Sequence, residues 1–231
     1  RSMAKYFTKK TDYVIGYSEV LSNNNWITRF QSLDFLMLMI AARGTTNIGL
    51  PWACSGQNQA YKKSFFKIIG GFSKIANQLQ GDDSLFLQIY LKNISKNVEF
   101  ADDKECRVNA RQENNIISFL KQRVRWSGDA KIMWKFNKIF FTFIIVTFLL
   151  PLMLITSFLY SIFLEPYFIT IFIRFLFIHF IIEFLLYFVG SKKLSKPIEL
   201  FSFYLWFLIH IPYVIVMGLG SFFAYRIQWR K

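Results

Sequence analysis

The chain has 231 residues, of which 54% are hydrophobic and 19% aromatic, and its 28 Lys and Arg against 14 Asp and Glu give a formal net charge of +14. Because the basic residues flank long apolar blocks, attraction to an anionic membrane surface accounts for most of this excess, and nucleic acid is not expected as a partner. The two cysteines, Cys54 and Cys106, show no paired spacing, which excludes a disulfide scaffold and a zinc site.

The first part of the chain alternates predicted strands and helices. Strands are expected over residues 12–20, 46–53 and 97–101, and helices over 26–42, 61–69, from Gly81 onward and over 116–134. The last of these helices is basic and leads toward the apolar blocks. Such alternation is typical of an α/β domain, which we place at residues 1–134.

Three long apolar blocks follow, at residues 139–163, 168–189 and 200–225. A helix needs ~20 apolar residues to cross the ~30 Å hydrocarbon core of a bilayer, and each block reaches that length. The blocks predict an all-α membrane domain of about three helices at residues 135–231. Basic residues before the first block and after the second predict a multi-pass protein of the cell (inner or cytoplasmic) membrane with its soluble part in the cytoplasm.

The third block leaves the topology open. If it crosses the membrane as a simple span, Arg226, Arg230 and Lys231 lie outside, against the tendency of basic residues to stay inside. Either Pro212 breaks the block into a re-entrant or interfacial pair, or the positive-inside tendency fails here.

Three ionisable side chains, Arg174, His179 and Glu183, fall inside the second block. His179 and Glu183 are one turn apart and share a helix face, whereas Arg174 points elsewhere. Ionisable groups at this depth indicate either a lipid-phosphate or acceptor site between helices, or partners on neighbouring helices and snorkelling.

A pair of carboxylates, Asp82 and Asp83, follows Gly81 at the start of a predicted helix. An acid at this position caps the helix, because its oxygens accept unpaired N–H groups of the first turn. One carboxylate suffices for a cap, so the other is free to accept a proton from a hydroxyl nucleophile. The pair is therefore a candidate catalytic base.

The segment QRVRW on the basic helix holds Gln122, Arg123, Arg125 and Trp126. Helical spacing lets Gln122, Arg125 and Trp126 face one cavity. A guanidinium makes forked contacts with phosphate oxygens, and an indole face stacks on a sugar ring. A snorkelling interfacial helix explains the arginines and the tryptophan but has no need of the glutamine.

The order of the motifs resembles a known family. A turn, CSGQN, holds Ser55, Gly56 and Asn58, and it precedes GGF, GDD, QRVRW and the apolar spans. Over about residues 12–126 this succession resembles the C-terminal half of the membrane-bound inverting glycosyltransferases of family two, which include cellulose and hyaluronan synthases. QRVRW matches every defined position of that family's Q-x-x-R-W motif, GDD matches its Glu-Asp or Asp-Asp motif, and CSGQN corresponds more loosely to the segment that lines the acceptor pocket.

The resemblance implies part of a GT-A fold and hexosyl transfer with inversion from a nucleotide-sugar donor. The acceptor is expected to be lipid-linked, a saccharide or another membrane-proximal molecule, in polysaccharide or glycolipid biosynthesis. Asp83, with Asp82 beside it, is implied to deprotonate the acceptor hydroxyl. Gln122, Arg125 and Trp126 are implied to hold the acceptor sugar and the donor diphosphate, and the neighbouring arginine of QRVRW to add charge.

The same family binds a divalent metal, Mg or Mn, through an Asp-x-Asp motif in its donor-binding half. No Asp-x-Asp pattern occurs in a suitable place in this sequence. We therefore expect a fragment that lacks the donor and metal half, carries no metal ligands and is inactive by itself. The alternative from another class is a non-catalytic membrane protein, such as a transporter subunit or a scaffold, whose soluble domain binds a partner.

Overall fold

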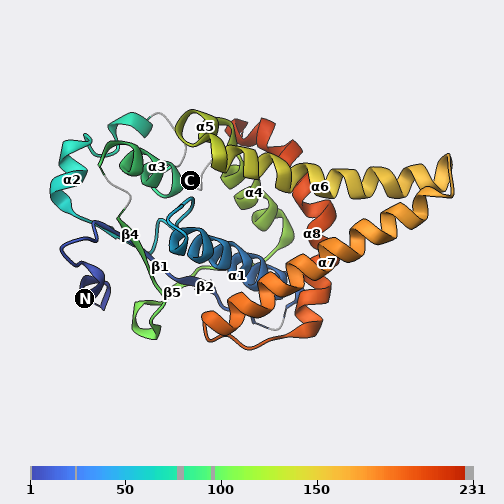
Figure 1. Cartoon of the computed structure of the whole chain (residues 1–231), viewed down its shortest axis with the longest axis horizontal. Helices are drawn as coiled ribbons and strands as arrows, with labels where there is room; N and C mark the ends of the chain where they lie inside the picture. Colours follow the sequence, from blue (N-terminus) through green and yellow to red (C-terminus); the bar gives the residue numbers. More distant parts are fainter. Residues whose placement is uncertain (1, 24, 77–80, 95–96, 227–231) are drawn as a thin grey trace.

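The computed structural model describes the chain apart from residues 1, 24, 77–80, 95–96 and 227–231. Figure 1 shows the strands and short helices gathered at one side of the molecule, and a long helical hairpin that projects from the other side. Arg230 and Lys231, which bear on the topology of the third apolar block, lie outside the described residues.

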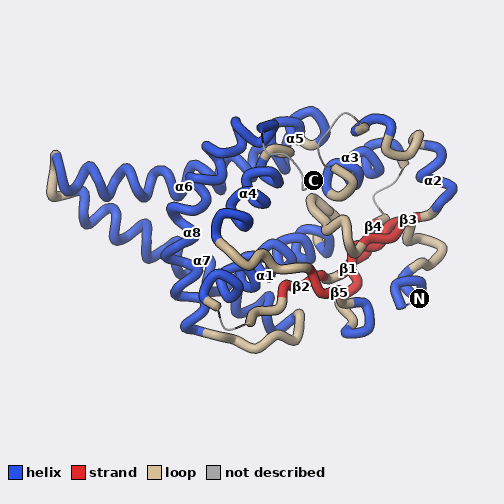
Figure 2. Tube along the Cα trace, turned by 180° about the vertical axis from the view of Figure 1, so that it is seen from behind, coloured by secondary structure: helices blue, strands red, loops and turns tan. Residues whose placement is uncertain are grey.

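Among the described residues, five short strands form two small sheets. They are β1 (Tyr13–Gly16), β2 (Ser18–Val20), β3 (Gln59–Tyr61), β4 (Val98–Ala101) and β5 (Val108–Ala110). The first sheet has the order β3-β1-β4, with β1 antiparallel to β3 and parallel to β4, and β2 pairs with β5 in parallel. Every residue of β1 is buried, as in a central strand. Figure 2 shows the two sheets end to end beside the long helix α1 (Trp26–Asn47).

The strand expected over residues 12–20 is divided into β1 and β2, which belong to different sheets. At the break, the side-chain amide of Asn58 donates hydrogen bonds of 2.8 Å to the carbonyls of Tyr17 and Cys106. A Cβ atom at Gly16 would collide with Asn58, so the glycine makes room for this amide. The amide adds to the backbone bonds that Tyr17 makes with Ala101 and Val108, and the sequence did not indicate it because Asn58 lies far from the break in the chain.

The prediction of a strand over residues 46–53 is wrong. Helix α1 continues through Gly44 to Asn47, and the chain then has no regular structure as far as the turn at Gly56. The hydroxyls of Thr45 and Thr46 donate to carbonyls one turn back, at 2.9 and 2.7 Å. These bonds let β-branched residues, which usually favour strands, extend the helix.

Between α1 and residue 137, the described residues also form four short helices. They are α2 (Lys63–Ile68), α3 (Ser84–Asn93), α4 (Ile116–Ser127) and α5 (Ala130–Phe136), with 3-10 turns at Ser2–Tyr6, Ser73–Ile75 and Lys104–Cys106. The basic helix expected over residues 116–134 is thus two helices, α4 and α5, separated at Gly128. A Cβ atom at Gly128 would lie 2.7 Å from the Cβ of Ala224, so the end of the chain packs against the break.

The three apolar blocks are confirmed as helices, and among the described residues they are the helices long and apolar enough to cross a membrane. They are α6 (Lys138–Phe163), α7 (Phe168–Lys193) and α8 (Leu200–Gly220), followed by a 3-10 turn at Ser221–Arg226. Helix α8 continues through Pro212, so the proline does not split the block into two helices. The described strands are small and do not by themselves make a complete GT-A domain.

One hydrophobic cluster joins the soluble helices to the membrane helices. Phe30 of α1, Phe119 of α4 and Tyr213 of α8 pack with ring centroids 5.3 to 5.8 Å apart. Farther along, Gly190 of α7 packs directly against Ile40 of α1. The helices that carry the sequence motifs are therefore held against the membrane helices through shared core contacts.

Candidate functional site

The two carboxylates of the GDD motif lie at the start of α3, as the sequence predicted. Asp83 is the N-cap residue, and its carboxylate accepts the backbone N–H of Ser84. Gly81 has φ +128°, and a Cβ atom there would lie 2.8 Å from Leu85. Only glycine adopts that backbone conformation without strain, so it fixes the direction in which the acids leave the turn.

The CSGQN turn lies directly against the acid pair. A Cβ atom at Gly56 would lie 3.2 Å from Oδ2 of Asp82, and Gln59 donates from Nε2 to the Asp82 carbonyl at 2.6 Å. The backbone N–H of Cys54 donates to Oγ of Ser84 at 3.3 Å. The sequence placed these two motifs in one site through the family resemblance. It missed the contacts of Cys54, the first residue of the turn, and of Gln59, which follows the turn and belongs to no motif.

The other two residues predicted from this turn occupy different positions. Ser55 is partly buried and its carbonyl accepts the N–H of Asn58 at 3.0 Å within the turn. The Asn58 side chain is buried at 4% exposure, and it donates to backbone carbonyls at the break between β1 and β2. Asn58 therefore holds the turn in place from inside, whereas Gly56 is exposed beside the acids.

The pKa of Asp83 is raised to about 6. Burial of the carboxylate is the largest cause, and the nearby charge of Asp82 adds to it. The N–H of Ser84 and the positive charge of Arg125 act in the opposite direction and favour the ionised form. A carboxylate with this pKa is a stronger base than an exposed aspartate and is still mostly ionised at pH 7.

Arg125 is the cation of this site. Burial lowers its pKa, and the surrounding acids Asp129, Asp83, Asp82 and Glu113 raise it in turn. A guanidinium keeps its charge under such conditions. Helix α4 therefore brings one permanent positive charge to the acids at the start of α3.

The remaining residues of QRVRW divide between two sides of α4. Gln122 donates a hydrogen bond of 3.3 Å from Nε2 to Oε1 of Glu113, an acid whose charge also acts on Arg125. Arg123 instead is 4% exposed and forms an ion pair of 2.9 Å with the buried Asp34 of α1. Its guanidinium lies 4.2 Å from the ring centroid of Trp126. The structure thus points Arg123 into the interior, and sequence reasoning missed its partner because Asp34 lies far away in the chain.

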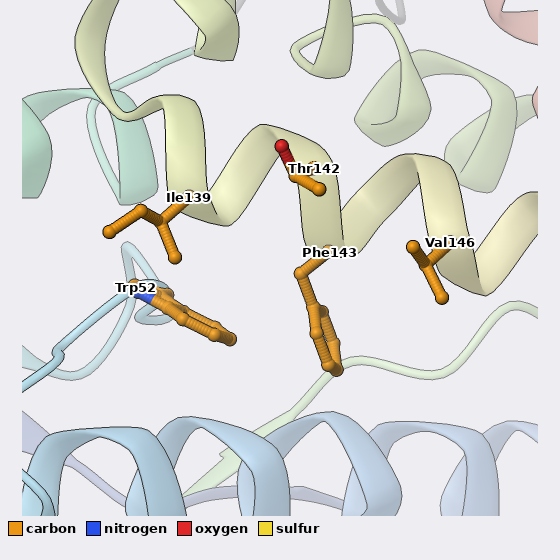
Figure 3. Close-up of a pocket in the computed structure, with 5 residues that line it drawn as sticks. All are labelled: Trp52, Ile139, Thr142, Phe143 and Val146. Atoms are coloured by element: carbon orange, nitrogen blue, oxygen red, sulfur yellow. The ribbon is translucent and has the colours of Figure 1, made fainter.

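An open apolar pocket of about 350 Å³ adjoins this site where the membrane segment begins. Figure 3 shows the ring of Trp52 facing the same space as Ile139 and Phe143 of α6. The pocket is lined by Trp52, Ile139, Thr142, Phe143 and Val146. Because Trp52 is two residues before Cys54, the pocket joins the CSGQN turn to the first membrane helix. No motif or spacing in the sequence indicated this pocket.

A chain of hydrogen bonds fixes Trp52 relative to the acids. Gln88 of α3 donates from Nε2 to the carbonyls of Pro51 and Trp52 at 3.0 and 2.8 Å. Its Oε1 accepts a bond of 2.8 Å from Asn137, which caps the start of α6. The same helix that begins with Asp83 therefore holds both the pocket loop and the membrane helix.

The ionisable residues of α7 lie on two faces, as their spacing predicted. The His179 ring is 5.4 Å from Phe207 of α8, and Glu183 is partly buried, whereas Arg174 is exposed. The interpretation of these residues as a lipid-phosphate site stays a prediction.

The described residues do not make a metal site. Among them, no group of three or more His, Cys, Asp or Glu is placed to hold a metal ion. Asp82 and Asp83 supply two carboxylates, and the cation beside them is Arg125. The expectation of Mg or Mn therefore rests on the family resemblance alone.

Comparison with known proteins gives one family. The family model described as glycosyl transferase family 21 matches residues 1–231. No curated protein and no solved structure matches the chain. Family 21 differs from family two, which the motifs resemble, but both are families of glycosyltransferases.

Proposed function

Because the chain belongs to glycosyltransferase family 21, we propose that it belongs to an inverting enzyme that transfers a hexose from a nucleotide-sugar donor to an acceptor hydroxyl at the cytoplasmic membrane surface. The observation that carries this proposal is the acid pair at the start of α3, held against the CSGQN turn, with the charge of Arg125 acting on Asp83. A base and a cation that act on opposite partners of a displacement are what the reaction needs.

The chemistry assigned to the two residues is a single displacement. The Asp83 carboxylate takes the proton of the acceptor hydroxyl as its oxygen bonds to the anomeric carbon of the donor. The bond from that carbon to the diphosphate breaks, and the nucleoside diphosphate leaves with the electron pair. Attack from the face opposite the leaving group inverts the anomeric configuration. Arg125 stabilises the charge that develops on the diphosphate.

The other motif residues support these two. We assign Gln122 to the sugar side of the site, and Ser55 and Gly56 to the wall of the acceptor pocket, in what we infer to be the acceptor half of a GT-A domain. Trp126, implied by the resemblance to stack on the sugar, instead packs against the interior guanidinium of Arg123. Arg123 acts from the interior through its ion pair with the buried acid of α1. The divalent metal implied by the resemblance has no ligand set among the described residues, so these roles are given to the chain's own side chains.

The apolar pocket favours an acceptor that carries a hydrocarbon chain. Its walls are the side chain of Trp52 and the first turns of α6, so a chain lying there would run along α6 toward the bilayer. A saccharide would gain stacking on the Trp52 ring alone, whereas a hydrocarbon chain is also stabilised by burial against the apolar side chains of α6. We therefore propose a lipid-linked acceptor over a soluble one.

The test is sugar transfer by membranes that contain the protein made from its complete reading frame. Labelled UDP- and GDP-hexoses are supplied in turn, and the product is separated into solvent-soluble and water-soluble fractions. We expect label in the solvent-soluble fraction and a loss of roughly 100-fold or more in Asp83→Asn. Asp103→Asn is the matched control, since Asp103 is an exposed acid paired with Lys5. If the Asp83→Asn variant transferred sugar at the unaltered rate, Asp83 would not be the base that deprotonates the acceptor.

A second variant addresses the acceptor. Trp52→Ala takes away one wall of the pocket but no group of the acid and cation pair. We expect the KM for the acceptor to rise and the KM for the donor to stay unchanged. Equal changes in both KM values would show that the pocket does not hold the acceptor.

A further inference from the structure

The start of α8 is tied to the soluble part of the molecule. In the loop before it, Lys196 forms an ion pair with Glu19 of β2. Arg107 donates from Nη2 to the carbonyl of Leu194 at 2.7 Å. This end of α8 therefore lies on the side of the sheets, as expected for a chain returning from α7.

The other end of α8 lies against the soluble part as well. Oγ of Ser127, at the end of α4, donates to the carbonyl of Met217 at 3.1 Å. Just beyond α8, the ammonium group of Lys131 in α5 lies 4.7 Å from the ring centroid of Phe222. Helices α4 and α5 precede the membrane hairpin and carry its basic residues, so both ends of α8 are on the same side of the molecule.

The contacts of α8 with the hairpin show that the helix crosses it. A third span beside α7 would bring the end of α8 to the turn between α6 and α7, near Glu165. Instead, Gly218 packs on Phe148 in the first half of α6. The ring centroid of Phe203 lies 5.0 Å from that of Tyr187 in the second half of α7. Figure 1 shows the hairpin extending well past the place where α8 crosses it.

One face of α8 is buried along its length and the opposite face is apolar and exposed. The buried residues include Phe203, Trp206, Phe207, Ile211 and Met217. The exposed stripe is formed by Phe201, Tyr204, Leu208, Val216 and Leu219. Steps of mostly three or four residues place these side chains along one side of the helix. A contiguous apolar stripe of this kind marks a surface that is covered by something other than water.

We propose that α8 does not cross the bilayer but lies along its surface on the side of the soluble part, with the exposed stripe in the acyl region of that leaflet. Helices α6 and α7 are then the membrane-crossing helices of the described chain. The occupant is lipid, because the stripe is continuous with the lipid-facing hairpin that α8 contacts.

This placement removes the conflict between the third apolar block and the basic residues after it. The chain leaves α8 on the side where it entered, so Arg226 follows on the same side as the basic residues of α4 and α5. It also gives α8 a role in the site. Helices α1 and α4 pack on its buried face, so α8 holds the cation of the site at the membrane surface.

Epitope tags test the proposal in sealed, oriented vesicles. One tag is placed between the exposed Lys9 and Lys10, one between Glu165 and Pro166, and one after Lys231, each in a separate variant of the complete protein. We expect an added protease to remove the first and the last tag from the same side and the middle tag from the other side. Removal of the last tag together with the middle one would overturn the proposal, and so would removal of all three from one side. The result does not depend on sugar transfer.

A pair of lysine variants gives an independent measure. Ile178 in the middle of α7 and Leu208 in α8 are both exposed apolar residues. A lysine in the centre of a span opposes insertion, whereas at an interface its ammonium group reaches water. We expect Ile178→Lys to lower membrane-integrated protein several-fold and Leu208→Lys to leave it unchanged. A loss in Leu208→Lys as large as that in Ile178→Lys would contradict an interfacial α8.

Discussion

The guanidinium of Arg125 on α4 lies close enough to the Asp83 carboxylate at the start of α3 for each group to shift the pKa of the other. The two residues are far apart in the sequence, and neither motif alone specifies the other. Their approach joins the acid motif, the QRVRW helix and the membrane surface in one site.

The pH dependence of transfer is expected to respond to Arg125 and Asp82 in opposite directions. Asp83 acts as a base only when it is ionised, so activity should rise with pH through its pKa of about 6. Arg125 lowers that pKa and Asp82 raises it. Arg125→Gln should therefore move the acid limb of the pH profile to higher pH, and Asp82→Asn should move it to lower pH.

The measurement is kcat/KM against pH for the two variants beside the unaltered enzyme. Arg125→Gln should also lower kcat, by roughly 100-fold if the guanidinium stabilises the leaving diphosphate. Shifts of the acid limb in the same direction for both variants would show that another group controls it.

Asp83→Asn is expected to make the fold more stable at alkaline pH while it removes activity. The folded-state pKa of about 6 lies above the ordinary value of 3.8, so ionisation of Asp83 opposes folding. The stability that this raised pKa contributes is fully present below the unfolded pKa and is lost as pH rises through about 6. Asparagine stays neutral and still caps a helix.

Thermal unfolding in detergent at several pH values provides the check. The midpoint for Asp83→Asn should exceed that of the unaltered protein at pH 8, and the difference should shrink toward pH 4. A midpoint below that of the unaltered protein at pH 8 would mean that the charge of Asp83 stabilises the fold.

The buried ion pair between Arg123 and Asp34 predicts a non-additive effect on stability. Burial raises the pKa of Asp34 and the charge of Arg123 lowers it, and both side chains are almost completely buried. Asp34→Leu leaves a buried guanidinium without its anion and should cost ~3–5 kcal/mol of unfolding free energy. The double variant Asp34→Leu, Arg123→Met removes both charges and should recover most of that loss.

Denaturant unfolding of the two single variants and the double variant forms the cycle. Independent, additive losses would show that the two side chains do not interact in the folded protein.

Asn58 is expected to affect stability much more than its neighbour Ser55. Asn58→Ala removes the side-chain donor from the carbonyls of Tyr17 and Cys106 in a buried position, and the Tyr17 carbonyl keeps the N–H of Val108, so the loss should be roughly 2 kcal/mol. Ser55→Ala should change stability by less than ~0.5 kcal/mol. Unfolding curves for the two variants compare these values directly, and an Asn58→Ala protein as stable as Ser55→Ala would contradict the structural role.

Local patterns in the sequence determined several elements correctly. The apolar blocks became α6, α7 and α8, the acids after Gly81 begin a helix, and residues 97–101 contain β4. Each of these depends on spacing or composition within a short window, which local backbone preferences follow closely. The prediction of a strand over residues 46–53 was wrong because the hydroxyls of Thr45 and Thr46 donate to helix carbonyls and extend α1.

Long-range contacts decided the rest of the site. Spacing on α4 lets Gln122 and Arg125 share a side, but nothing near Arg123 in the sequence reveals that Asp34 neutralises it. The apolar pocket likewise combines Trp52 with residues of α6 that are distant in the chain. Only the folded chain shows which charged side chains are neutralised by a buried partner and which face the site.

Helix α8 shows most clearly what the sequence determines and what only the tertiary structure decides. Its length and composition alone predict that the block is helical and avoids water, and by those measures it is long and apolar enough to cross a membrane, as the two hairpin helices are. Hydropathy reports how much apolar surface a helix carries and not what covers that surface. The tertiary structure decides the covering, because α1 and α4 bury one face of α8 and both of its ends rest on the soluble part.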